Sequence, residues 1–147
     1  MDDKAAIEAL MYQYCIAIDR ADFKAFARLF AHAVWLVEGV EPGPESAGNV
    51  ILYEDGTPRT KHIVSNVTIE VDAAADCARG HSYVTVYQQV SERPLQVIFA
   101  GEYFDEFERQ EGAWRFKSRD IRHPLIGDLR GHLKLPSATF PTAGGYA

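Results

Sequence analysis

Residues 79–123 decide the fold, and they read RGHSYVTVYQQVSERPLQVIFAGEYFDEFERQEGAWRFKSRDIRH. The stretch contains three runs rich in Val, Ile, Thr, Tyr and Phe, which are residue types that favour β-strands. Only the short breaks 92–94 and 110–112 separate these runs, and strands joined by such short connections pair antiparallel. The stretch therefore predicts an antiparallel meander of long strands.

The part of the chain before the meander begins with a helical pattern. Apolar residues recur at helical spacing over 3–20, and Asp22 is a suitable N-cap for a second helix over 22–31. A β-prone run follows, and the Pro- and Gly-rich loop after it has room for one short helix near 45–53. Helices followed by a meander predict an α+β domain with the helices on one face of the sheet. The strands are expected near 33–40, 60–71, 78–91, 95–110 and 112–123.

Composition sets the class of molecule. The chain has 147 residues, of which 47% are hydrophobic and 24% are charged, as in a globular protein that buries a substantial core. We expect a single domain over 1–133 and an irregular tail over 134–147. The formal net charge of −6 argues against nucleic acid as a partner. The apolar segment 125–129 within this domain is expected to lie across a pocket mouth or a subunit interface.

Cysteine use and the N-terminal sequence indicate the compartment. Cys15 and Cys77 form no CxxC pair, and such sparse thiols are typical of a reducing cytosol. We find neither the pattern of a signal peptide nor an apolar run long enough for a membrane helix. We therefore expect a cytoplasmic protein with no membrane partner.

Motif searches give no sign of a cofactor or a metal site. The chain contains no GxGxxG, no GxxxxGK[ST], no GxSxG and no HExxH motif. Its histidines also lack a clustered spacing typical of metal ligands. They are His32, His62, His81, His123 and His132. We therefore expect neither cofactor nor metal.

Two ionisable residues lie in apolar surroundings. Asp19 closes the first helix on the same face as Tyr12 and Ile16, so it is either a polar helix end or a carboxylate that needs a buried partner. His62 lies near the start of the strand 60–71, where an imidazole is either a general base at a cavity mouth or an ordinary surface or core histidine.

Aromatic residues alternate along the meander. One strand face contains His81, Tyr83 and Tyr87, and a face of the next strand contains Phe99 and Tyr103. Such rows usually form the core, but a buried tyrosine hydroxyl also orients ligands.

Several segments resemble the SnoaL-like branch of the nuclear transport factor 2 superfamily. They are IDRADF (18–23), TKHIVSNV (60–67), ARGHSY (78–83), AGEY (100–103) and GAWRF (112–116). The resemblance covers about 5–133. It implies a strongly curved, cone-like mixed sheet wrapped around the N-terminal helices, one deep apolar pocket, and a homo-oligomer, either dimer or trimer.

The resemblance also implies a site. In two enzymes of the superfamily, scytalone dehydratase and lindane dehydrochlorinase, an Asp at the end of the first helix works with a His at the start of a strand, and Asp19 and His62 occupy the matching positions. A second histidine and an asparagine of the dehydratase are matched here by Tyr87 and Tyr103, and a basic residue of the dehydrochlorinase by Tyr14.

We therefore expect a cofactor-independent lyase of the dehydratase or dehydrohalogenase type, or an isomerase, acting on a small apolar cyclic or aromatic molecule. His62 would remove a proton and Asp19 would orient it. The expected substrate-binding residues are Tyr14, Trp35, Asn66, Tyr83, Tyr87, Phe99 and Tyr103. The alternatives are a non-catalytic binding or assembly module, or an accessory subunit like the β subunit of ring-hydroxylating dioxygenases.

Overall fold

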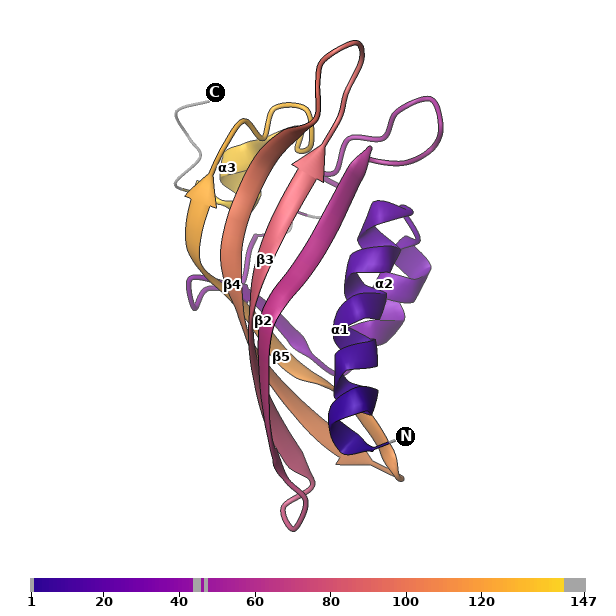
Figure 1. Cartoon of the computed structure of the whole chain (residues 1–147), viewed down its shortest axis with the longest axis vertical. Helices are drawn as coiled ribbons and strands as arrows, with labels where there is room; N and C mark the ends of the chain where they lie inside the picture. Colours follow the sequence, from indigo (N-terminus) through magenta and orange to yellow (C-terminus); the bar gives the residue numbers. More distant parts are fainter. Residues whose placement is uncertain (1, 44–45, 47, 142–147) are drawn as a thin grey trace.

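Two helices lie on one side of a strongly curved sheet in a computed structural model, which describes residues 2–43, 46 and 48–141 (Figure 1). The helical elements are α1 (Asp3–Asp19), α2 (Phe23–Leu29) and the short α3 (Pro136–Thr139). The strands are β1 (Val34–Val37), β2 (Thr60–Asp72), β3 (Cys77–Gln88), β4 (Gln96–Gln110) and β5 (Ala113–Ile126). None of the described helices is both long and apolar enough to cross a membrane.

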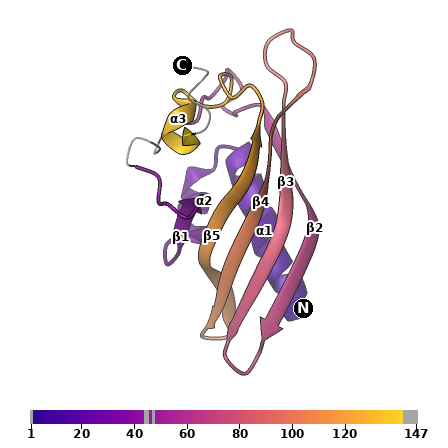
Figure 2. The same cartoon turned by 90° about the vertical axis from the view of Figure 1, so that its left-hand side faces the viewer.

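The five strands form one mixed sheet in the order β1-β5-β4-β3-β2. Strands β2 to β5 form an antiparallel meander, and β1 pairs parallel with β5, beside which it lies in Figure 2. The predicted α+β architecture with a curved mixed sheet is confirmed. The second helix begins where expected, because the side chain of Asp22 accepts a hydrogen bond of 3.0 Å from the backbone N–H of Ala25.

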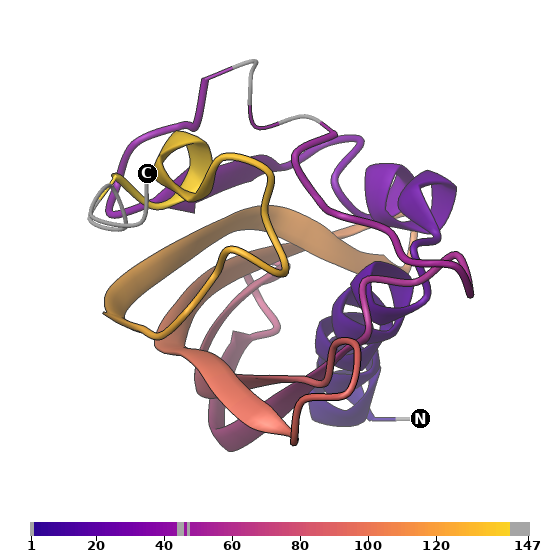
Figure 3. The same cartoon turned by 90° about the horizontal axis from the view of Figure 1, so that it is seen from above.

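Bulges explain how such long strands curve. The register shifts between Ser65 and Thr68 in β2, and again between Ala100 and Glu102 in β4. Asn66, inside the first of these irregularities, has a left-handed φ of 53°. A bulge bends its strand and increases the local twist, so the sheet curves strongly and turns its concave side toward the helices (Figure 3).

Side-chain size determines which face of β3 turns inward. Ala78, Gly80, Ser82, Val84, Val86 and Gln88 are buried, and the larger residues between them point outward. Small inner side chains allow the helices and the opposite part of the curved sheet to approach closely. A Cβ on Gly80, for example, would lie 3.2 Å from the ring of Phe107.

Two expectations about irregular segments are corrected. Residues 48–53 of the helix expected near 45–53 are not helical, because Val50 instead forms an antiparallel bridge with Leu133. Ser46 has a helical conformation, and residues 45 and 47 lie outside the described residues. The tail from 134 is not irregular throughout, because it contains α3 and then Phe140, whose ring lies 4.7 Å from that of Phe99. Residues 142–147 are outside the described part.

Candidate active site

The last residue of α1 and the third residue of β2 meet at the hollow side of the sheet. Nδ1 of His62 lies 2.6 Å from Oδ1 of Asp19, within the separation of about 3.5 Å that hydrogen bonding requires. Both side chains are largely buried, with exposed fractions of 8% for His62 and 12% for Asp19. The structure thus brings together the two residues that the sequence placed at the ends of different elements.

Three donors hold the carboxylate of Asp19. Its Oδ1 accepts hydrogen bonds from the Thr60 hydroxyl at 2.8 Å and from His62 Nδ1, and its Oδ2 accepts one from the backbone N–H of His62 at 2.8 Å. Burial alone would raise the pKa of Asp19, but the hydrogen bonds and charge of His62 outweigh burial and hold this pKa below its usual range. Asp19 is therefore ionised at neutral pH.

An ionised carboxylate only accepts hydrogen bonds, so it fixes the tautomer of His62. In this tautomer the proton lies on Nδ1, and Nε2 keeps its lone pair. No described residue donates a hydrogen bond to that Nε2. The arrangement can therefore accept a proton at Nε2, and Asp19 stabilises the imidazolium that forms.

A cavity of about 890 Å³ lies against this pair. Its wall is mainly apolar, and four of the residues expected to bind substrate contribute to it together with His62. They are Tyr14, Trp35, Phe99 and Tyr103. A volume of this size suits a small organic molecule.

Three residues expected to bind substrate do not line the cavity. Tyr83 and Tyr87 lie on the outward face of β3, opposite Val84 and Val86, and Tyr83 is 46% exposed. Asn66 is exposed at the bulge of β2. The expectation for these residues is wrong because strand alternation defines two faces but does not say which of them the helices cover.

A buried ion pair lies behind two tyrosines of the cavity wall. Arg119 donates two hydrogen bonds of 2.8 Å to Asp105, and both side chains are fully buried. The guanidinium carbon lies 3.7 Å from the ring centre of Tyr103 and 4.2 Å from that of Tyr14. These contacts fix both rings from behind.

The two tyrosine hydroxyls differ in their partners. Trp35 Nε1 donates to the hydroxyl of Tyr14 at 3.1 Å, whereas the Tyr103 hydroxyl has no hydrogen-bond partner among the described residues. Burial raises the pKa of Tyr103 well above its usual value, so the hydroxyl keeps its proton. Tyr103 is therefore a donor available to a molecule in the cavity.

His132 is a cavity residue that the sequence analysis did not single out. It lies after β5, is 8% exposed, and its ring centre is 6.2 Å from that of His62. Burial and the charge of His62, partly opposed by Asp19, lower the pKa of His132 to about 4. The only signal in the sequence is its position between Leu129 and Leu133, both of which are buried.

This low pKa makes the stability of the fold depend on pH. Between pH 6.5 and pH 4 the unfolded chain binds a proton at His132 that the folded chain does not bind, so the free energy of unfolding falls as the pH falls. The loss attributable to His132 is about 3 kcal/mol across this window. Urea unfolding of wild type and His132→Phe at several pH values measures it. Identical pH slopes would contradict the assignment.

The segment after β5 closes the open end of the cavity. Leu129, His132, Leu133 and Phe140 all line it. Within the segment 125–129, Leu129 is buried against the cavity, whereas Leu125 is 74% exposed. The segment that covers the cavity, residues 129–140, therefore lies mainly C-terminal to the segment 125–129 that the sequence analysis predicted.

Asn49 joins this segment to the loop before β2. Its Nδ2 donates to the Leu135 carbonyl at 2.8 Å and to the Thr139 hydroxyl at 3.2 Å, and its Oδ1 accepts from the Leu135 N–H at 2.8 Å. Asn49→Ala is expected to lower the free energy of unfolding by about 1–3 kcal/mol, because these buried groups lose their partners. Chemical denaturation measures the change. The exposed Gln89→Ala is the control and should stay within about 0.5 kcal/mol; an equal effect would contradict the assignment.

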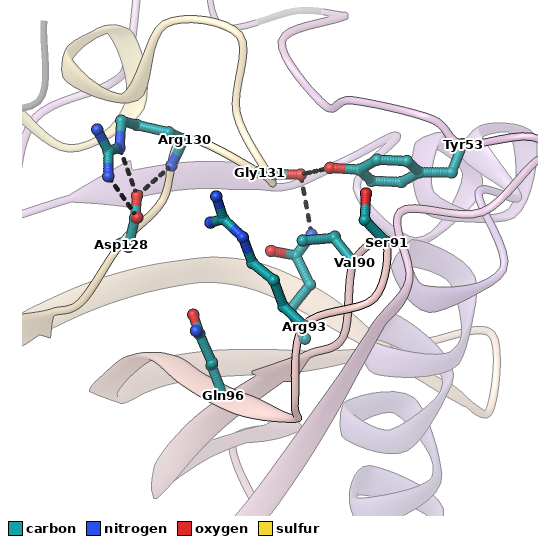
Figure 4. Close-up of a pocket in the computed structure, with 9 residues that line it drawn as sticks. Tyr53, Val90, Ser91, Arg93, Gln96, Asp128, Arg130 and Gly131 are labelled. Atoms are coloured by element: carbon teal, nitrogen blue, oxygen red, sulfur yellow. Dashed lines mark hydrogen bonds and ion pairs between the residues drawn. The ribbon is translucent and has the colours of Figure 1, made fainter.

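A second, smaller pocket of about 430 Å³ lies between Tyr53 and the segment 128–131 (Figure 4). Arg130 forms an ion pair of 2.7 Å with Asp128 on one side of it. On the other side, the Gly131 carbonyl accepts hydrogen bonds from the Tyr53 hydroxyl and from Gln88 Nε2.

Within the described ranges, no three His, Cys, Asp or Glu side chains are grouped so that they could hold a metal ion.

Comparison with known proteins places the chain in a family. The model of the SnoaL-like domain matches residues 1–120. A gamma-hexachlorocyclohexane dehydrochlorinase of Sphingobium indicum is 28% identical over 148 residues, which cover 96% of this chain and 94% of that protein.

Two solved structures from Novosphingobium aromaticivorans share the fold. One is provisionally named a scytalone dehydratase; it has a TM-score of 0.61 and 23% identity and covers 89% of this chain and 91% of its own. The other is an NTF2-like protein with a cystatin-like fold, with a TM-score of 0.64, 18% identity, and 81% and 80% coverage. With the family match over residues 1–120, the chain belongs to the SnoaL-like domain family.

Proposed function

We propose that this protein is a cofactor-independent lyase that eliminates water or a halide from a small, largely apolar cyclic molecule. One observation carries the proposal: the carboxylate of Asp19 fixes His62 so that an unpartnered Nε2 remains beside an apolar cavity of about 890 Å³. A fixed imidazole with a free nitrogen is suited, as a general base, to removing a proton from carbon next to an activating group.

In the proposed reaction, His62 Nε2 takes a proton from a carbon atom of the substrate. The electron pair of the broken C–H bond forms a C=C double bond, and the leaving group departs with the electrons of its own bond to carbon. A halide departs as the anion, whereas a hydroxyl takes up the proton from the His62 imidazolium and departs as water. Asp19 keeps its negative charge throughout and stabilises the imidazolium. The Tyr103 hydroxyl donates a hydrogen bond to the oxygen or halogen that gains charge.

The comparisons support an elimination. A relative named a dehydrochlorinase aligns over 96% of this chain. Return of the proton to another carbon would give an isomerase instead, and the same pair would serve it. The products distinguish these reactions, because an elimination releases water or chloride and an isomerisation releases neither.

The test uses two probes of different leaving groups. γ-Hexachlorocyclohexane is followed by chloride release. The other probe is 3-hydroxy-1-tetralone, whose hydroxyl is β to the carbonyl, and it is followed by formation of 1-naphthol as water is lost. Acceleration of either reaction over buffer is the expected result. Binding of both probes, seen as a thermal shift, without conversion of either would contradict the proposal and favour a binding module.

A further inference from the structure

A second imidazole, from a distant part of the chain, faces the proposed base. The ring of His132 is inclined by 64° to that of His62, with 6.2 Å between the ring centres. His62 belongs to the sheet and His132 to the segment that covers the cavity. A molecule in the cavity would therefore lie within reach of both rings.

The ring nitrogens of His132 are not used by the fold. Nδ1 is enclosed and has no hydrogen-bond partner, and no described residue bonds to Nε2 either. A buried histidine that serves only the structure normally has its nitrogens paired, because an unpaired buried polar atom is costly. The ring of His132 is therefore not explained as a satisfied core residue.

The position of Nδ1 decides which nitrogen carries the proton. The ring is neutral at neutral pH, because burial lowers its pKa to about 4, so it has one N–H and one lone pair. Buried N–H groups without a hydrogen-bond partner are rarer in proteins than buried acceptors without one. We therefore assign the lone pair to the enclosed Nδ1. Nε2 then carries the proton and is a donor.

The backbone around His132 is held without help from its ring. The His132 N–H donates to the Leu129 carbonyl at 2.9 Å, and the His132 carbonyl accepts from the Ile51 N–H at 2.8 Å. The preceding Gly131 carbonyl accepts from Tyr53 and Gln88 (Figure 4). A Cβ at residue 131 would lie 3.1 Å from Gln88 Oε1, so this packing leaves little room for a side chain. The ring is thus preorganised for a ligand.

We propose that His132 Nε2–H donates a hydrogen bond to an acceptor oxygen of the ligand, so that the site selects small apolar ring compounds that carry a ketone or similar oxygen. The inference deepens the proposed function and rests on it for the identity of the cavity. In an elimination, this donor would polarise the carbonyl whose adjacent C–H bond His62 breaks. His132 is then a specificity-determining residue.

The test compares acetophenone with ethylbenzene, which share a phenyl ring and similar size but differ in the carbonyl. Calorimetric Kd values are measured for wild type, His132→Phe, His132→Gln and, as a matched control, the exposed His32→Phe. For wild type, the Kd of acetophenone is expected to be about three- to tenfold lower than that of ethylbenzene, once both values are corrected for the different aqueous solubilities of the two probes. The His32→Phe variant should keep this preference. His132→Phe should lose it, and His132→Gln, whose amide donates from a similar position, should recover part of it.

Two further readouts separate the possible failures. Ring ¹⁵N shifts should show the Nε2–H tautomer of His132, with a change on adding acetophenone. Retention of the preference by His132→Phe, equal binding of both probes by wild type, or binding of neither overturns the assignment of His132. If the preference depends on His132 while neither 3-hydroxy-1-tetralone nor γ-hexachlorocyclohexane is converted, the assignment is supported and the proposed elimination is contradicted.

Discussion

Replacing His62 by alanine is expected to reduce turnover of any substrate of this protein to the background rate. The variant loses the only group in the proposed mechanism that accepts the proton from carbon, and general base catalysis contributes about 10²–10⁴-fold. Initial rates of 1-naphthol formation measure the loss. The fold should remain, because Asp19 is the only hydrogen-bond partner of the His62 ring within the described part of the chain.

His81→Ala is the matched control for this experiment. His81 lies on the outer face of β3, where its Nε2 is 2.7 Å from Glu102, so it forms a histidine–carboxylate contact away from the cavity. Its replacement should leave the rate unchanged. A fully active His62→Ala variant, or equal losses in both variants, would refute the mechanism.

Asp19→Asn should slow turnover by about 10²–10⁴-fold while preserving the shape of the site. An amide no longer selects the tautomer with the proton on Nδ1, nor does it stabilise the imidazolium. The substitution should lower kcat more than it changes KM, because Asp19, unlike Trp35 and Phe99, does not line the cavity. A rise in KM alone would contradict an orienting role for Asp19.

The second large effect concerns stability. Asp105→Ala is expected to lower the free energy of unfolding by about 3–5 kcal/mol, because it leaves the charge of Arg119 buried without its partner. Burial alone would lower the pKa of Arg119, but the charge and hydrogen bonds of Asp105 outweigh it and raise this pKa. The guanidinium keeps its charge after the substitution, because arginine is not deprotonated in proteins even without a partner. Chemical denaturation at neutral pH measures the loss.

Two further variants test the cause. Glu108→Ala removes a partly exposed ion pair of 3.0 Å with Arg115 and should cost less than about 1 kcal/mol. The double variant Asp105→Leu with Arg119→Leu removes both buried charges and should recover much of the lost stability. A double variant as unstable as Asp105→Ala would show that lost packing, rather than the unpaired charge, is responsible.

The sequence was most informative where the local pattern was strong. The helical spacing before Asp19 and the strand pattern around His62 gave the ends of two elements, and the fold brings those ends together. The faces of β3 were not predicted correctly, because Tyr83 and Tyr87 suggested a core although the smaller Ser82 and Val84 are the inward residues.

His132 shows where sequence reasoning stops. No periodic element surrounds it, so neither a helix face nor a strand face could be assigned. Its place depends on long-range bonds, from Ile51 to its carbonyl and from Tyr53 and Gln88 to Gly131. Contacts between such distant parts of the chain leave no local pattern to recognise.

The covering segment also has a consequence for biosynthesis. The cavity wall includes both Tyr14 and Phe140, so it is complete only after residue 140 has been translated. While the ribosome still holds the covering segment in its exit tunnel, the emerging helices and strands have no finished binding site. They must therefore fold without a ligand as a template, and the cavity first becomes able to bind once residue 140 has left the tunnel.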